Sequence, residues 1–162
     1  MANHGIALVT GAARRIGRVI ALSLARHGWD VAVHYRFSES EAMATAEDIR
    51  KLGRRSVALH CDLTDEEAVN RLLQRVEDSL GKPSCLVNNA SVFEHDSVTD
   101  FSAHSLDFHM RTNLTAPVLL SRALHTMTPE GSQSVVVNLL DQKLDNLNPS
   151  FLSYTLSKAA LN

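Results

Sequence analysis

The sequence of 162 residues contains few cysteines, no strong excess of charge and no long hydrophobic run. Its two cysteines, Cys61 and Cys85, lie inside apolar segments, so we expect buried free thiols in a reducing cytoplasm rather than a disulfide. A formal net charge of −2 argues against nucleic acid as a partner. No apolar stretch approaches the roughly 20 residues that span a bilayer, and the N-terminus does not resemble a signal peptide. We therefore expect a cytoplasmic protein without a membrane partner.

The chain also lacks the features that divide a protein into parts or build a metal centre. The eight histidines are scattered without metal-ligand spacing, so we expect no metal site. There is no internal repeat, low-complexity segment or linker. A hydrophobic content of 44% is sufficient for one core, and residues 1–162 are expected to form a single dinucleotide-binding and catalytic domain.

Short apolar runs alternate with amphipathic segments along the whole chain. Strands are expected at Ile6–Thr10, Asp30–Tyr35, Ser56–Cys61, Ser84–Asn88 and Ser134–Leu140. Helices are expected at Ile16–Arg26, Ser40–Leu52, Thr64 to Gly81, Phe101–Met127 and Phe151–Asn162, of which the fourth is long enough to be interrupted. Thr64 and Glu67 have the spacing of a capping box. The alternation predicts an α/β fold, a doubly wound parallel sheet of Rossmann type with five strands.

The first strand runs directly into the string TGAARRIG at residues 10–17 and then into a helix. Gly11 permits a tight turn, the small Ala12 and Ala13 let the backbone approach a diphosphate, and Gly17 lets the helix pack against the sheet. The helix N-terminus would then face the anion. A tight turn without any ligand is the alternative interpretation.

The end of the second strand bears on the choice between NAD and NADP. An acidic residue there binds the ribose hydroxyls of NAD, whereas an arginine accommodates the additional phosphate of NADP. Here the strand ends in HYRFS, and the first carboxylate is Glu39. Arg36 can pair with a phosphate and Ser38 can donate a hydrogen bond to it. The sequence therefore favours NADP.

A tyrosine and a lysine lie one turn apart on the last expected helix, in the string YTLSK. A phenol is a weak acid until a nearby cation stabilises the phenolate, and Lys158 is expected to lower the pKa of Tyr154 in this way. A surface pair without function is the alternative. Two carboxylates, Asp141 and Asp145, precede this helix, and a carboxyl group near a phenol can take part in proton delivery.

These motifs, in this order, resemble the short-chain dehydrogenase/reductase superfamily over residues from Ile6 to Asn162. Arg15 stands where most members have a glycine, and Asp141 stands where most have a serine. Both departures, together with the HYRFS loop and the string NNAS at residues 88–91, resemble the pteridine-reductase branch. The resemblance implies that Asn113 interrupts the long helix and takes part in a proton relay.

The resemblance also assigns roles to the motif residues. It implies catalytic roles for Asp141, Tyr154, Lys158 and Asn113. It implies cofactor contacts from Gly11, Arg15, Ile16, Tyr35, Arg36, Ser38, Asp62, Leu63, Asn89, Ala90 and Lys158. It implies substrate contacts from Arg15, Ser91, Phe93, Asp141 and Tyr154. Phe93 would stack on a flat pterin ring, with core packing as the alternative. His34 would assist the cofactor loop or simply end the strand.

The function implied is hydride transfer from NADPH to a dihydropteridine of the dihydromonapterin, dihydrobiopterin or dihydrofolate type. One alternative is a general carbonyl or 3-oxoacyl reductase of the same superfamily, and another is a non-catalytic NADPH-binding sensor. Related enzymes form tetramers and continue through further strands. We therefore expect a homo-oligomer, a chain truncated at its C-terminus with little activity alone, and an exposed sheet edge at Ser134–Leu140.

Overall fold

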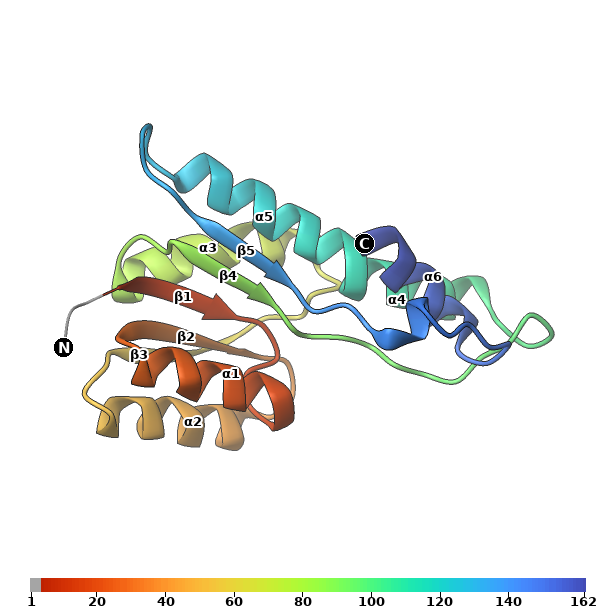
Figure 1. The fold of residues 1–162 in the computed structure, drawn as a ribbon, viewed down its shortest axis with the longest axis horizontal. Helices are drawn as coiled ribbons and strands as arrows, with labels where there is room; N and C mark the ends of the chain where they lie inside the picture. The colour runs from red at the N-terminus through yellow and green to blue at the C-terminus, as the bar shows by residue number, and fades with distance from the viewer. Residues whose placement is uncertain (1–3) are drawn as a thin grey trace.

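The computed structural model describes residues 4–162 and has one parallel sheet flanked by helices (Figure 1). The strands are β1 Gly5–Val9, β2 Trp29–Tyr35, β3 Ser56–His60, β4 Cys85–Asn88 and β5 Val135–Asn138. The helices are α1 Arg15–Arg26, α2 Glu39–Lys51, α3 Glu66–Leu80, α4 Ala103–Met110, α5 Ala116–Met127 and α6 Leu152–Leu161. A π-helical segment, Arg111–Thr115, and a short 3-10 helix, Gln142–Leu144, complete the list.

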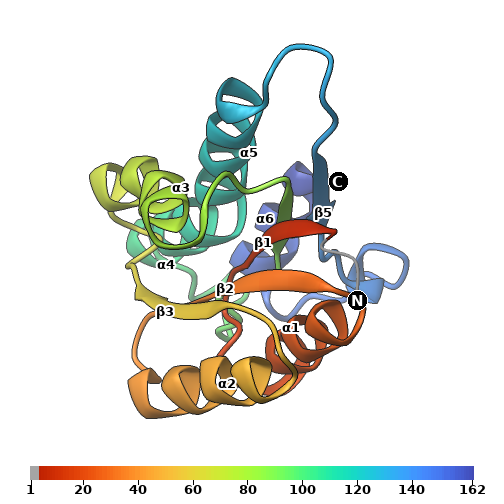
Figure 2. The same ribbon diagram turned by 90° about the vertical axis from the view of Figure 1, so that its left-hand side faces the viewer.

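The strand order is β3-β2-β1-β4-β5, and every neighbouring pair is parallel. Alternate side chains of β1 enter different cores, because successive residues of a strand point to opposite faces. Ile6 and Leu8 pack with α3 and α5, whereas Ala7 and Val9 pack with α1 and α2. Figure 2 shows these two helix pairs on opposite faces of the sheet. The doubly wound fold with five strands is confirmed.

This topology places the ends of β1 and β4 side by side where the strand order reverses. Ligands of open α/β sheets bind at such switch points, beyond the carboxyl ends of the strands. The two ends are fastened together, because the Thr10 amide donates to the Val87 carbonyl at 3.0 Å. The glycine turn after β1 and the asparagine string after β4 are thereby held against each other.

Two helix boundaries depend on local chemistry. The long fourth helix is interrupted as expected, because Arg111–Thr115 forms a π-helical segment between α4 and α5, and Asn113 lies within it. The expected capping box at Thr64 is wrong. The N-cap of α3 is Asp65, whose side chain accepts a hydrogen bond from the Ala68 amide, whereas the Thr64 hydroxyl donates to Asp62.

The edge strand β5 has side chains that are all exposed, including Val135, Val136 and Val137. This confirms the expected sheet edge. Beyond the carboxyl end of the sheet, α4 and α6 pack against each other (Figure 1). Among residues 4–162, no helix has the length and apolar character required to cross a membrane.

Candidate functional site

A cleft of about 820 Å³ opens beyond the carboxyl ends of the strands. Its volume lies in the range of small-molecule sites, roughly 300 to 1,000 Å³. Most of the expected site residues line it: Gly11, Arg15, Ile16, Tyr35, Arg36, Ser38, Asp62, Leu63, Asn89, Ala90, Ser91, Phe93, Asp141 and Tyr154. Asn113 and Lys158 are buried and lie outside this lining. Residues from five separate motifs therefore meet at one site.

The glycine turn leaves no room for larger residues. Gly11 has a φ of +64°, and a Cβ there would lie 3.0 Å from the Ala90 Cα. A Cβ on Gly17 would lie 2.2 Å from the Gly11 carbonyl oxygen. The Ala12 amide donates to the His34 carbonyl at 2.9 Å and is therefore not free to bind a ligand. The start of α1 lines the cleft instead, and a helix N-terminus is a favourable place for an anion.

Arg15 is the first residue of α1 and has an unusual backbone for a long side chain, with a φ of +51°. It is exposed and, within residues 4–162, forms no ion pair. Positive φ in non-glycine residues costs free energy and is concentrated at functional sites. The guanidinium at this turn therefore remains available for an anionic or polar ligand.

Asn88, Asn89 and Thr10 connect the ends of β1, β4 and β5 through hydrogen bonds. The Thr10 hydroxyl oxygen accepts hydrogen bonds from the amides of Asn89 and Ala90, at 2.9 and 3.0 Å. The Asn89 side chain donates to the Thr10 carbonyl at 2.8 Å, and the Asn88 side chain donates to Asn138 in β5 at 2.8 Å. These bonds hold the loop after β4 against the glycine turn.

Arg36 lies between aromatic rings and a carboxylate at the adenosine side of the expected site. Its guanidinium pairs with Asp62 at 2.8 Å and lies over the rings of Phe37 and Phe108, at 4.5 and 5.3 Å. Its Nε is buried and has no hydrogen-bond partner within the described chain. A cation with an unused donor, beside two aromatic faces, suits a phosphorylated nucleoside. The residues present therefore fit an NADP-type cofactor.

Both the oxygen and the nitrogen of the Asn113 side chain form hydrogen bonds, which join the loop after β4 to α6. Its oxygen accepts from the Val92 amide at 2.8 Å and the Ser91 hydroxyl at 3.2 Å. Its nitrogen donates to the Val92 carbonyl at 3.0 Å and to Ser157 in α6 at 2.9 Å. The π-helical turn brings Asn113 to this position, and the residue fixes the loop that carries Ser91 relative to the helix that carries Tyr154.

Tyr154 and Asp141 form a short hydrogen bond across the cleft. The phenol donates to the Asp141 carboxylate at 2.5 Å, and the other carboxylate oxygen accepts from the Lys143 amide at 2.8 Å. Burial, followed by the charge and hydrogen bond of Asp141, raises the pKa of Tyr154 well above its ordinary value. The same hydrogen bond, assisted by the Lys143 amide, lowers the pKa of Asp141. The pair therefore holds its proton on the phenol at neutral pH.

The expectation that Lys158 lowers the pKa of Tyr154 is corrected. The Lys158 ammonium donates to the Leu139 carbonyl at 2.8 Å and lies 5.9 Å from the centre of the Tyr154 ring. Only 3% of Lys158 is exposed, and this burial lowers its pKa, whereas the negative charge of Asp141 acts to raise it. In this arrangement Lys158 provides a buried positive charge near Asp141 and Tyr154 without a direct bond to the phenol.

An aromatic cluster forms one wall beside the tyrosine. Phe93 stacks on Phe151 with the ring centres 4.2 Å apart and meets Tyr154 edge-on at 4.6 Å. Phe93 is 55% exposed, so core packing does not describe it. Phe151 has a left-handed backbone, with a φ of +62°, immediately before α6. Sequence reasoning missed its contribution, since an aromatic at a helix start gives no signal of a binding site.

Other residues of the cleft also went unnoticed in the sequence. Phe37, Glu94, Phe108 and Thr112 line it. Phe37 lies within the HYRFS loop and could have been inferred from its position there. Phe108 comes from α4, and nothing in an amphipathic helix pattern separates a cleft residue from one in the core.

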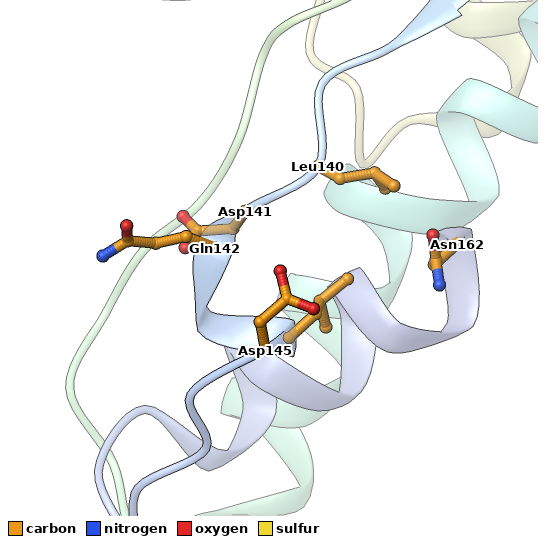
Figure 3. Close-up of a pocket in the computed structure, with 6 residues that line it drawn as sticks. Leu140, Asp141, Gln142, Asp145 and Asn162 are labelled. Atoms are coloured by element: carbon orange, nitrogen blue, oxygen red, sulfur yellow. The ribbon is translucent and has the colours of Figure 1, made fainter.

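Asp141 also borders a second, shallower hollow of about 350 Å³. Figure 3 shows this hollow between the loop after β5, which carries Gln142 and Asp145, and the end of α6, where Asn162 lies. Asp145 is exposed and lines only this hollow, whereas Asp141 bonds to Tyr154. The geometry therefore favours Asp141 over Asp145 as the carboxylate that acts with Tyr154.

Comparison with known proteins supports this reading of the cleft. A family model described as short chain dehydrogenase matches residues 5–162. Two solved structures of FolM alternative dihydrofolate reductase 1, from Brucella canis and Brucella suis, are each 40% identical to the chain, with TM-scores of 0.93 and 0.92. They align with 98% and 97% of this chain and with 64% and 65% of theirs, and both contain NADP. That ligand agrees with the cofactor expected from the sequence.

Among curated proteins, the 3-oxoacyl-(acyl-carrier-protein) reductase FabG of Staphylococcus epidermidis is 31% identical over 158 residues. The alignment covers 96% of this chain and 64% of FabG, so the chain spans less than two thirds of the length of this relative. The match of the family model to nearly the whole chain, on a sheet of the appropriate order with the motif residues gathered at one cleft, shows that the chain belongs to the short-chain dehydrogenase family.

Proposed function

We propose that this chain is the cofactor-binding and catalytic part of an NADPH-dependent reductase that acts on dihydropteridines. The observation that carries the proposal is the hydrogen bond of 2.5 Å between Tyr154 and Asp141 in the cleft. A ring nitrogen must receive a proton when a C=N bond is reduced. The pair holds such a proton between two oxygens, with the buried Lys158 cation nearby.

Cofactor binding would use the two ends of the cleft. The start of α1, with Arg15 and Ile16, would hold the diphosphate, and Arg36 with Ser38 would hold the phosphate on the adenosine ribose. Asp62 would contact the adenine and would then share its pairing with Arg36. NADPH would supply the hydride, and the protein would supply binding, orientation and charge.

Proton delivery would begin from the phenol. The raised pKa of Tyr154 and the lowered pKa of Asp141 keep the proton on Tyr154 until a more basic nitrogen is presented to it. Asp141 orients the phenol through the short bond. Once the proton has left, the two oxygens carry two negative charges, and the positive charge of Lys158 limits the cost of that state.

Substrate binding would use the aromatic wall. Half of the Phe93 surface is exposed, and the ring stands edge-on to Tyr154. A flat heterocycle would lie against this wall with its polar edge toward Ser91 and Arg15, which also line the cleft. The 40% identity to the FolM proteins supports a substrate of this class.

A general carbonyl or 3-oxoacyl reductase is the second candidate, and the similarity to FabG favours it. Asp141 argues against it, because the oxygen of a ketone needs only one proton donor and does not require a carboxylate bonded to that donor. A non-catalytic NADPH sensor would need neither Tyr154 nor Lys158.

The test is the substitution Tyr154→Phe in the full chain. Loss of a general acid lowers turnover by about 10² to 10⁴-fold, so NADPH oxidation with dihydropteridine should fall by that factor. NADPH binding, followed by the fluorescence of the reduced cofactor, should stay within about twofold of the unsubstituted chain. Turnover at the original rate would refute the proton route.

A further inference from the structure

His34 lies at the junction of three strand ends and had no assigned role beyond assisting the loop or ending the strand. It is the penultimate residue of β2, and its side chain is almost fully buried, with 2% exposed. Buried histidines require partners for both ring nitrogens. His34 has both, and each belongs to a different loop of the cofactor cleft.

The two hydrogen bonds determine which ring nitrogen carries the proton. The Gly11 amide donates to Nδ1 at 3.0 Å, so Nδ1 must be the unprotonated nitrogen. Nε2 then carries the hydrogen and donates to the Cys61 carbonyl at 3.0 Å. A neutral ring is also what burial favours, since it lowers the pKa of His34 to about 4. The ring therefore bridges the glycine turn after β1 and the loop after β3.

We infer that His34 is a positioning residue that sets the glycine turn for the cofactor diphosphate and connects it to the adenine side of the cleft. This inference rests on the proposed NADPH site. Gly11 has the left-handed backbone that redirects the chain from β1 into α1, and its amide is oriented by the His34 ring. The next amide, of Ala12, donates to the His34 backbone carbonyl. One residue thus directs two successive amides of the turn.

The connection to the adenine side runs through Cys61. Its carbonyl accepts from the His34 ring, and its amide donates to the Tyr35 carbonyl at 3.0 Å. Asp62 follows directly and pairs with Arg36. A single imidazole ring therefore fixes the distance between the turn that faces the diphosphate and the loop that faces the adenosine. Both parts of the dinucleotide site are in position before the cofactor binds.

Two substitutions, each of which keeps a polar atom near one ring nitrogen, separate the two bonds. In His34→Asn, the amide oxygen occupies the position of Nδ1 and still accepts from Gly11, but the bond to Cys61 is lost. In His34→Gln, the amide nitrogen reaches the position of Nε2 and still donates to Cys61, but the Gly11 amide loses its acceptor. Leaving a buried donor unpaired costs far more than losing an exposed one.

The experiment measures NADPH dissociation constants by cofactor fluorescence and the hydrogen exchange of the Gly11 amide by NMR, on the full chain and both variants. We expect His34→Gln to weaken NADPH binding about tenfold and to speed Gly11 exchange about tenfold, as for one lost hydrogen bond. His34→Asn should leave Gly11 exchange within about threefold of the unsubstituted chain, because the acceptor is kept, and should weaken NADPH binding about tenfold through the lost bond to Cys61. Circular dichroism of both variants should show that the fold is retained.

Equal effects of the two variants on Gly11 exchange would overturn the inference, because they would mean that the bond from the Gly11 amide to the ring does not hold the turn. If the unsubstituted chain does not bind NADPH, the proposed function fails. The exchange of the Gly11 amide, which is measured without cofactor, then still decides whether His34 holds the turn.

Discussion

The substitution Asp141→Asn tests the short hydrogen bond that distinguishes this cleft. In the variant the amide oxygen can still accept from the Lys143 amide, whereas the amide nitrogen that then faces Tyr154 can only donate to the phenol oxygen, so the charged acceptor of the phenol is lost. Hydrogen bonds to charged groups contribute about 1.5–3 kcal/mol and neutral ones about 0.5–1.5 kcal/mol. The difference of about 1–1.5 kcal/mol corresponds to about a tenfold change. We therefore expect kcat/KM for a dihydropteridine to fall about tenfold.

The same variant should lower the pKa of Tyr154, because Asp141 is one of the groups that raise it. The phenol then remains a competent acid for a ketone, so kcat/KM for a simple ketone should stay within about twofold. Asp145→Asn is the matched control, since Asp145 is exposed in the same loop and outside the larger cleft, and it should leave both rates unchanged. An equal loss for both substrates in Asp141→Asn, or no loss for either, would refute the role given to this carboxylate.

Other consequences of the structure can be measured independently. Gly17→Ala places a methyl group against the Gly11 carbonyl, so urea unfolding should show a loss of about 1–3 kcal/mol, and an unchanged midpoint would contradict the packing. Arg36→Gln should raise the dissociation constant of NADPH about tenfold, for the loss of a charged hydrogen bond, and leave that of NADH nearly unchanged; equal effects would place the phosphate elsewhere. Burial lowers the folded-state pKa of His34 from 6.5 to about 4, so the unfolded chain binds more protons between these values. The free energy of unfolding should therefore fall by about 3 kcal/mol as the pH drops from about 6.5 to 4. His34→Asn should remove this dependence of stability on pH, and an unchanged dependence in the variant would show that His34 does not titrate in this way.

The location of the site could be predicted because a parallel sheet brings the carboxyl ends of its strands to one edge. Residues that follow β1, β2, β3 and β4 in the sequence line the same cleft, so the order of the motifs was sufficient to gather them. Asn113 is a further example. The resemblance to the family implied an interruption of the long helix at this residue, whose type has low helix propensity, and the π-helical turn occurs there.

The electrostatic state of the site could not be predicted in the same way. The interval of four residues places Lys158 one helical turn from Tyr154, but it does not reveal that the ammonium group donates to the Leu139 carbonyl. The raised pKa of Tyr154 depends on burial and on Asp141, which arrives from another element at an angle that only tertiary packing decides. The sequence predicted a lowered pKa for Tyr154, and this direction was wrong because it took only Lys158 into account.

The stack of Phe93 on Phe151 and the bridge made by His34 belong to the same class of tertiary detail. Each joins segments that lie far apart in the sequence, and each uses a residue type whose commonest fate is ordinary packing. The N-cap of α3 was also beyond prediction from the sequence. Thr64 and Asp65 are both good N-cap residues, and Asp65 caps the helix because the hydroxyl of Thr64 is bonded to Asp62.

The most direct test of the proposed function compares kcat/KM for NADPH oxidation by the full chain with dihydromonapterin, dihydrobiopterin, dihydrofolate and a simple ketone. The account predicts that at least one of the dihydropteridines is preferred over the ketone by about 10²-fold or more, as expected when a site is built to hydrogen-bond a substrate group that the competitor lacks. A ketone turned over as well as or better than all three dihydropteridines would contradict it.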